Sequence, residues 1–138
     1  MTIDDYDEVM EQMKRTRGVT FRDADSREST ALYLIRNPSL SFIATIDGNT
    51  VGCIMSGNDG RRGYLQHLVV HIEHRRKGLA NALVERCLSA LEALGIKKSH
   101  IDVLNENQTG IAYWESQGWQ LRTDIKRYSI VRGGEKNA

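Results

Sequence analysis

The feature that most constrains the fold is the stretch of residues 64–94, where an apolar run, a basic turn and a long amphipathic segment follow one another directly. Residues 64–70 are extended and apolar, which is typical of a strand. From Leu79 onward, apolar residues recur at alternating spacings of three and four, as they do in a helix that buries one face. Gly95 supplies a residue that commonly ends such a helix. The stretch therefore predicts a strand, a tight turn and a helix over residues 79–94.

The turn between this strand and helix has the pattern R-x-x-G-x-A and runs from Arg75 to Ala80. Gly78 allows a close approach of the backbone to a bulky group, and the first turn of a helix presents N–H groups that have no partner within the helix. The helix dipole and the neighbouring basic side chains both favour an anion here. The turn thus predicts a phosphate site, although a glycine-softened helix start with solvated basic side chains explains so short a motif equally well.

Residues 64–94 as a whole resemble the acetyl-CoA-binding motif of the GNAT superfamily of N-acetyltransferases, in which a strand, the pattern R/Q-x-x-G-x-G/A and a helix follow one another. A second resemblance lies in residues 107–119, where the family has N-x-x-A/G-x-x-x-Y-x-x-x-G-F/W. The positions that match this pattern in register are Asn107, Gly110, Gly118 and Trp119. Trp114 stands where the family usually places a tyrosine.

Length and composition predict a single domain over residues 1–138 with a flexible tail from about residue 133, because 138 residues at 40% hydrophobic content can bury a real core. The formal net charge of +1 argues against a nucleic-acid-binding protein. No apolar run reaches membrane-spanning length and the start of the chain is acidic, which favours a cytoplasmic protein without membrane association. Cys53 and Cys87 have no metal or redox spacing and are expected to be buried, reduced thiols.

Apolar periodicity, capping residues and turn residues predict the remaining elements. In chain order the expected elements are a helix over 4–17, a loop over 18–25, a helix from Ser26 to Pro38, strands over 41–46, 50–56 and 64–70, the helix over 79–94, a strand over 99–104, a short helix around 111–114 and strand material over 122–131. This order resembles the mixed α/β fold of the GNAT family. Only Thr2 and Ile3 precede the first helix, so the family's first edge strand is expected to be missing or vestigial.

The resemblance implies acetyl-CoA as the co-substrate. Its amide arm would pair with the backbone of Leu68, Val69 and Val70, and the N–H of Leu68 would steady the oxyanion. The residues predicted to hold the pyrophosphate are Arg75, Arg76, Lys77, Gly78, Leu79 and Ala80. Asn107 is expected to cap its helix, to hydrogen-bond the pantetheine arm, or both. Trp114 is expected at the cofactor site, with core packing as the alternative.

Proton transfer is less well defined by the sequence. Tyr64 and Gln66 occupy positions where other family members have a Glu or a His, and both are expected to position a water. Trp114 replaces the tyrosine that usually protonates departing CoA, and Tyr113 would point about 100° away on the helix. Because a thiol has a pKa near ~8.5, CoA is expected to leave as a thiolate.

The alternation of side chains along the strand over 64–70 predicts on which face of the sheet its histidine lies. Simple alternation places on one face Tyr64, Gln66, Leu68 and Val70, and on the other Leu65, His67 and Val69. His67 is then a core-side histidine, and His71 borders the cofactor groove. No metal site is expected, because the spacing of His67, His71 and His74 is not that of a zinc site.

Two clusters of charged residues have two possible interpretations. Each is either a solvated turn or a site that binds a charged acceptor. They are Asp59, Arg61 and Arg62 in one turn, and Arg22, Asp23 and Asp25 in the loop between the first two helices.

The sequence thus predicts an N-acetyltransferase that moves an acetyl group from acetyl-CoA to a primary amine by direct attack in a ternary complex. The acceptor would be a small molecule or a peptide, and the chain could form a homodimer. A non-catalytic acyl-CoA-binding sensor stays open, because the family tyrosine and a carboxylate in the central strand are both missing. A small nucleotide-binding adaptor that uses the same basic turn is the third alternative.

Overall fold

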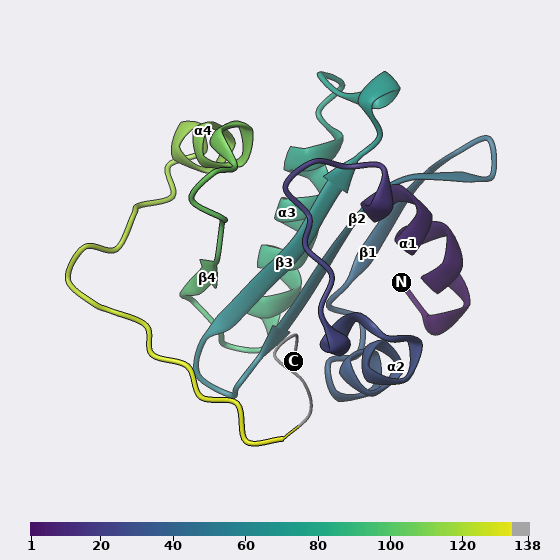
Figure 1. Cartoon of the computed structure of the whole chain (residues 1–138). Helices are drawn as coiled ribbons and strands as arrows, with labels where there is room; N and C mark the ends of the chain where they lie inside the picture. The colour runs from purple at the N-terminus through teal and green to yellow at the C-terminus, as the bar shows by residue number, and fades with distance from the viewer. Residues whose placement is uncertain (134–138) are drawn as a thin grey trace.

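The computed structural model describes residues 1–133 and contains a four-stranded sheet in the order β1-β2-β3-β4 (Figure 1). The strands are β1 (Phe42–Ile46), β2 (Asn49–Asn58), β3 (Gly63–Val70) and β4 (Ser99–Ile101). The first three form an antiparallel meander, and β4 joins β3 in parallel. The sheet is mixed, which confirms the predicted α/β class. All but the first residue of the predicted tail over 133–138 lies outside the described residues.

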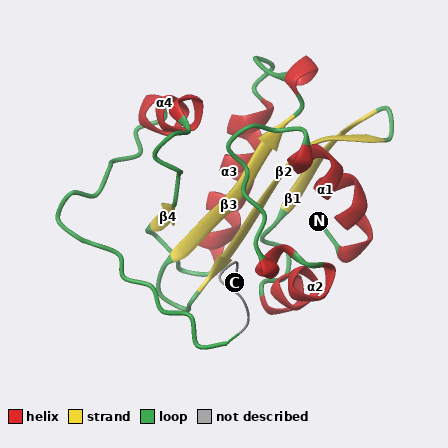
Figure 2. Cartoon of the chain, viewed as in Figure 1, coloured by secondary structure: helices red, strands yellow, loops and turns green. Residues whose placement is uncertain are grey.

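Helices cover both faces of this sheet. In chain order they are α1 (Tyr6–Lys14), α2 (Arg27–Arg36), α3 (Leu79–Ala93) and α4 (Gln108–Ser116), with short 3-10 turns η1 (Ile3–Asp5), η2 (Asp23–Asp25) and η3 (Ile72–His74). Figure 2 shows α1 and α2 in front of the sheet and α3 behind it, while α4 lies on the side of β4. The first described element is η1, so no strand precedes α1 within residues 1–133.

The two faces of the sheet bury separate apolar clusters. Behind the sheet, the stripe predicted for α3 packs on the strands, and the fully buried Leu91 and Cys87 meet Ile54 of β2. In front, Val9 and Met13 of α1 pack against the other face. Burying each such side chain contributes about 1.5–3 kcal/mol to folding. Because the layers lie on opposite faces, β2 and β3 are covered on both sides.

Local sequence explains the turns that set this arrangement. Asp47 and Gly48 form the two-residue β1–β2 turn with φ of 51° and 79°, the positive values that a tight hairpin turn needs. Ser26, the first residue of the predicted helix, caps α2 by accepting a hydrogen bond from the backbone N–H of Ser29. The hairpin and the cap were therefore both readable from residue type.

A β-bulge in β3 changes the predicted alternation of its side chains. Cys53 pairs with Val69 and Met55 pairs with Gln66, so that His67 and Leu68 both lie opposite the single residue between them. His67 has φ of 54°, in the left-handed region. A bulge shifts the alternation by one residue, and the prediction for the second half of the strand is therefore wrong.

The corrected faces follow from the clusters. Leu65 and Val70 lie in the cluster behind the sheet and Leu68 packs against it, whereas Val69 is buried in the cluster beneath α1. Leu68 and Val70 thus do not share a face with Tyr64, contrary to simple alternation.

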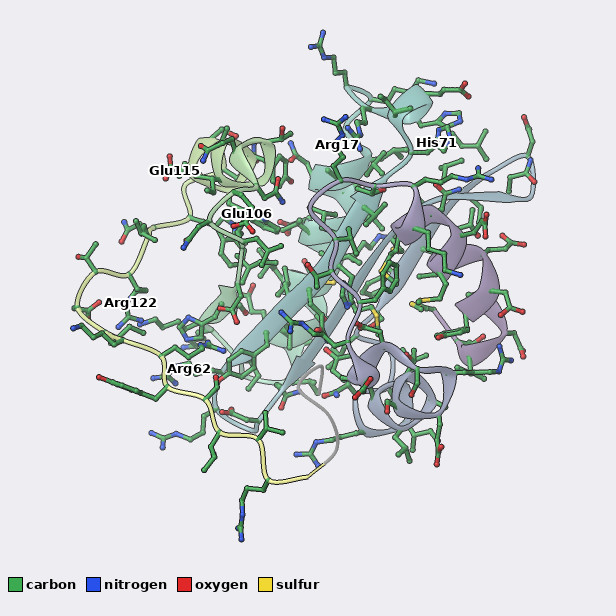
Figure 3. The ribbon with its side chains drawn as sticks, in the orientation of Figure 1. Arg17, Arg62, His71, Glu106, Glu115 and Arg122 are labelled. Carbon is green, nitrogen blue, oxygen red and sulfur yellow. The ribbon has the colours of Figure 1, made fainter. Side chains whose placement is uncertain are left out.

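The predicted strand over 122–131 is also wrong. Within residues 1–133 no strand follows β4, and the segment after α4 runs outside the sheet, with Arg122 projecting from it (Figure 3). Its apolar side chains are exposed, including Ile125 and Tyr128. The physical reason is the shortness of β4: a ladder of three residues, not the predicted 99–104, offers too few backbone groups at its free edge to hold a further strand.

Candidate active site

The candidate site lies where β3 and β4 diverge. Ladder pairing joins the two strands at three positions only and ends at the pair Leu65 and Ile101. β3 continues to Val70, whereas the chain after Ile101 leaves the sheet. Within the described chain, the backbone of residues 66–70 therefore has no strand partner on its β4 side. Free backbone groups at such a gap can pair with an extended ligand.

A cleft of about 730 Å³ opens at this divergence. The α1–α2 loop, residues 15–26, crosses in front of β3 and forms one wall (Figure 1). Predicted site residues that line the cleft are Tyr64, Gln66, Leu68, Asn107 and Trp114. The structure thus brings together predicted site residues of β3 and of the α4 region, which are distant in the sequence.

A paired histidine and aspartate lie on the wall of this cleft. His67 Nε2 lies 2.7 Å from Asp25 Oδ1, and both side chains are mostly buried. Burial alone would raise the pKa of Asp25, but the hydrogen bonds from His67 and from the backbone N–H of Arg22 outweigh it and hold that pKa below its ordinary value. Asp25 is therefore ionised at neutral pH, and His67 is tied to the α1–α2 loop.

The cleft also contains a buried hydroxyl group from α2. Tyr33 Oη has no hydrogen-bond partner of good geometry among residues 1–133, although it lies near Gln66 of β3. Burial raises the pKa of Tyr33 to about 12, although the nearby Gln66 acts in the opposite direction. Tyr33 thus stays protonated at physiological pH and can donate a hydrogen bond into the cleft.

Tyr64 is engaged at the outer end of the cleft. Its hydroxyl donates to Asp59 Oδ2 at 3.3 Å, and its ring lies against His100 of β4. Asp59 itself accepts from the backbone N–H groups of Arg61 and Arg62, which holds its pKa below the ordinary value. This turn is closed by its own hydrogen bonds, as a solvated turn would be.

The basic turn before α3 has the backbone that the sequence predicts. Gly78 has φ of 79° and precedes the first residue of α3, and no side chain caps the helix. The first N–H groups of the helix, beginning at Leu79 and Ala80, are therefore available to a ligand. Arg76 also has a positive φ, of 63°, a conformation that few non-glycine residues adopt.

The basic side chains of this turn differ in their hydrogen-bond partners. Arg75 Nε donates to the carbonyl oxygen of Val70 at 2.9 Å, which ties the turn to the end of β3. Lys77 Nζ lies 3.4 Å from His74 Nδ1. Arg76 forms no side-chain hydrogen bond or ion pair within residues 1–133, so its guanidinium group is the one most available to an anion.

His71, Glu73 and His74 form a small polar cluster at the end of β3. Their potential ligand atoms all lie within 4.8 Å of one another. However, His71 Nδ1 already accepts from the backbone N–H of Glu73, and Lys77 brings a positive charge to His74. His67, the third histidine of the sequence pattern, faces Asp25 instead. The cluster is therefore a poor cation site.

Helix α4 places the residues of the second motif. Asn107 caps α4, because its Oδ1 accepts from the N–H of Gly110 at 3.0 Å. Its amide also lies against the α1–α2 loop: a Cβ added at Gly18 would be 2.6 Å from Asn107 Nδ2. The capping role predicted for Asn107 is thus confirmed.

Trp114 belongs mainly to the core. It is 7% exposed and packs edge-on against Trp119, with ring centroids 4.8 Å apart. Tyr113 instead donates its hydroxyl to Asn81 of α3, and partial burial raises its pKa. Trp114 thus packs in the core, as the alternative interpretation predicts, and it also lines the cleft.

Sequence reasoning assigned no role to Tyr33 and left Asp25 as an open alternative. Asp25 and His67 are separated by 42 positions and share no motif, so the only available signal was that both lie in segments that border the site. A second, larger cavity of about 1300 Å³ lies between β4, α4 and residues 120–127. It borders the segment that failed to form a strand, rather than the charged groups described above.

With this geometry in place, the chain can be compared with known proteins. The family model described as the acetyltransferase (GNAT) family matches residues 6–119. The chain belongs to the GNAT family. The match runs from the start of α1 to Trp119, so both GNAT motifs and the α1–α2 loop lie within it.

Curated GNAT relatives are named as acetyltransferases. One from Sodalis glossinidius (strain morsitans) is 35% identical over 92 residues, which are 67% of this chain and 65% of the relative. Another, from Pectobacterium atrosepticum, is 39% identical over 82 residues, or 59% of this chain and 58% of the relative. The matched segment thus spans less than two thirds of the length of these relatives.

Solved GNAT structures share the fold. The PaiA N-acetyltransferase of Thermoplasma acidophilum in complex with coenzyme A has a TM-score of 0.79 at 18% identity, covering 91% of this chain and 89% of that one. The aminoglycoside acetyltransferase AAC(6')-Iy, in complex with a bisubstrate analogue, has a TM-score of 0.72 at 18% identity, with 96% and 95% covered. In the part of the chain that the structure describes, no helix is long and apolar enough to cross a membrane.

Proposed function

We propose that this GNAT chain is an N-acetyltransferase that moves an acetyl group from acetyl-CoA to a primary amine, by direct attack in a ternary complex. The observation that carries the proposal is the divergence of β3 from β4 next to the free N-terminus of α3. This divergence exposes unpaired backbone along β3, and the helix start supplies N–H groups for phosphates. The acetyltransferase names of the curated relatives support the same activity.

In this proposal, acetyl-CoA supplies the thioester, and the chain binds and orients it. The backbone of Leu68, Val69 and Val70 offers hydrogen bonds to an amide arm, and the N–H of Leu68 faces the developing oxyanion. The bulge at His67 and Leu68 supports this role, because a bulged residue is released from the ladder with β2.

The phosphates lie at the turn before α3. Arg76 and Lys77 supply charge, and the N–H groups of Gly78, Leu79 and Ala80 supply hydrogen bonds. Arg75 contributes chiefly by holding the turn, since its Nε already donates to Val70. Asn107 orients α4 through its cap and borders the pantetheine arm, and Trp114 forms the floor of the cleft.

The acceptor amine, on a small molecule or a peptide, approaches from the side of the α1–α2 loop. The polar groups there, Tyr33 and Gln66, position a water or the amine itself. CoA leaves as a thiolate, because the family tyrosine is replaced by a largely buried Trp114. The organisation as one domain and the formation of a homodimer stay predictions.

Calorimetric titration with acetyl-CoA, NAD and ATP tests the cofactor, and a panel of amines with detection of the released thiol tests the reaction. We expect acetyl-CoA to bind most tightly and at least one amine to release CoA. Tighter binding of NAD or ATP would favour the nucleotide-binding adaptor. Tight binding of acetyl-CoA without turnover of any amine would favour the acyl-CoA sensor, for which the replacement of the family tyrosine by Trp114 is the supporting observation.

A paired substitution tests the phosphate site directly. Replacing Arg76 and Lys77 together by Ala should raise the Kd for CoA far more than the Kd for pantetheine, which carries no phosphate. Lys14→Ala/Arg15→Ala on the exposed end of α1 is the matched control and should change neither. Equal weakening for both ligands would show that the turn acts through folding.

A further inference from the structure

The pair formed by His67 and Asp25 is not used by the function proposed above, and it combines three unusual features. His67 is a non-glycine residue with φ of 54°, at the bulge of β3. Its side chain and that of Asp25 are only 16% and 14% exposed, yet both line the open cleft. Left-handed backbone is uncommon in residues other than glycine, although histidine adopts it more often than most, and strained backbone clusters at functional sites.

Asp25 is held in place independently of His67. Its Oδ2 accepts from the backbone N–H of Arg22 at 2.8 Å, and its own carbonyl oxygen accepts from the hydroxyl of Tyr6 at 2.7 Å. Oδ1 is then left to accept from His67 Nε2. Because Asp25 is ionised, it favours the tautomer of His67 that carries its proton on Nε2.

This arrangement leaves Nδ1 of a neutral His67 as a proton acceptor. Among residues 1–133, Nδ1 has no hydrogen-bond partner, and it is not one of the buried polar atoms that are enclosed without a partner. It therefore has access to the cleft or its water. The charged and titratable groups around the imidazole are Asp25 and Arg22 from the loop, Tyr6 from α1, Tyr33 from α2 and the thiol of Cys53 from β2, which donates to the carbonyl oxygen of His67.

We propose that His67 is the general base of the acetyl transfer and that Asp25 is the positioning residue that fixes its tautomer and orientation. This inference rests on the proposed function. Tyr64 and Gln66 have no basic group at neutral pH, whereas a neutral imidazole does. A histidine oriented by a carboxylate is also the arrangement by which many enzymes keep one ring nitrogen free for proton transfer.

The proton balance is as follows. The bound ammonium group of the acceptor gives one proton to Nδ1 of His67 and becomes a neutral amine. The amine nitrogen attacks the thioester carbon, a C–N bond forms and the C–S bond breaks. The departing thiolate takes up the second proton, which the nitrogen loses on becoming an amide. His67 returns its proton to solvent, and Asp25 stabilises the imidazolium in the interval.

The decisive variant is His67→Asn. Asparagine tolerates the left-handed conformation and keeps a polar side chain at the cleft, but it cannot take up a proton. With the best amine from the panel, we expect kcat to fall about 10²-fold or more, while the Kd for acetyl-CoA and the Tm stay close to those of the native chain. The variant can use only acceptor that is already neutral, so its loss of rate against the native chain should shrink as the pH approaches the pKa of the acceptor amine.

Asp25→Asn tests the positioning role. It should lower kcat less than His67→Asn, and it should shift the tautomer of the neutral imidazole away from Nε2–H, as seen in long-range ¹H–¹⁵N spectra of the histidine ring. Asp7→Asn is the matched control, because Asp7 forms an exposed ion pair with Arg27 on the same side of the sheet. We expect it to leave kcat and the histidine spectra unchanged.

The ¹H–¹⁵N spectra of the native chain test the role of His67 even if a variant fails to fold. Native His67 should carry its proton on Nε2 when neutral, and the reverse tautomer would overturn the proposal. A His67→Asn variant that keeps full kcat would show that the pair is only a latch between the loop and β3. If the native chain turns over no amine, the proposed function is wrong and this assignment falls with it.

Discussion

Arg75 Nε donates a hydrogen bond of 2.9 Å to the carbonyl oxygen of Val70, so that the basic turn before α3 is fastened to the last residue of β3. Both residues were predicted to face the cofactor. Their contact shows that Arg75 has a structural partner, and that the position of the turn depends on the end of the strand. Charge and geometry can therefore be separated by experiment in this turn.

Arg75→Lys should weaken acetyl-CoA binding although it keeps the charge, because lysine lacks the planar Nε–H donor that reaches Val70. We expect the Kd to rise about tenfold, which corresponds to ~1.4 kcal/mol. Arg76→Lys is the matched control, because it makes the same chemical change at the neighbouring position. It should leave the Kd for acetyl-CoA nearly unchanged. Calorimetric titration of both variants decides the matter, and equal effects would contradict a structural role for Arg75.

Gly78→Val should lower both stability and affinity. A Cβ at Gly78 meets nothing within 4 Å, but φ of 79° disfavours a β-branched residue by about 1–2 kcal/mol. Gly60→Val is the matched control, because Gly60 also has a positive φ, of 94°, and open surroundings. Both variants should lose a similar free energy of unfolding in urea, but only Gly78→Val should raise the Kd for acetyl-CoA. Loss of affinity in both would show that the effect is general.

The stability of the fold should decrease at alkaline pH. Burial raises the pKa of Tyr33 from 10.0 to about 12, so above pH 10 the unfolded chain releases the phenolic proton while the folded chain keeps it. The contribution of Tyr33 is therefore complete below pH 10 and is lost as the pH approaches 12, by about 2–3 kcal/mol.

Urea unfolding at pH 9, 10 and 11 measures this loss, and Tyr33→Phe should make the decline shallower. Burial also raises the pKa of Cys53 to about 12, which adds a loss of the same sign that begins near pH 9. An unchanged slope in Tyr33→Phe would show that the hydroxyl titrates normally.

Trp114→Tyr restores the residue that the family usually has, but it should not accelerate the reaction. Trp114 is buried between Tyr113 and Trp119, and a smaller ring leaves a cavity there that costs about 1–3 kcal/mol. We expect a lower Tm and a kcat within about threefold of the native value, roughly 0.6 kcal/mol. A large rise in kcat would reveal that the missing general acid limits the proposed reaction of the native chain.

Much of the fold could be predicted because its signals are local. The apolar spacing of α3, the turn residues between β1 and β2 and Ser26 at the start of α2 are each local signals, and the elements that they predict are confirmed. The bulge in β3 could not be predicted, because alternation along one strand contains no information about the register of its partner.

The strand predicted over residues 122–131 failed because local composition does not show whether a partner strand is available. Its composition suits a strand, but a strand also needs a partner edge, and β4 provides three residues only. The pair of His67 and Asp25 could not be predicted for the same reason. Neither residue has a distinctive pattern in its own segment, and only the packing of the α1–α2 loop over β3 brings them together. Contacts between distant segments require the fold itself.

The contact between Gly18 and Asn107 has a consequence for the order of events during synthesis. The α1–α2 loop leaves the ribosome well before α4 and its cap, which follow β4 in the chain. Because a long-range contact forms only when both of its partners exist, the loop cannot pack against Asn107 until residue 107 has emerged. Nascent chains truncated before residue 107 should therefore form the meander of β1 to β3 without a closed cleft, and acetyl-CoA binding should appear only once α4 has emerged.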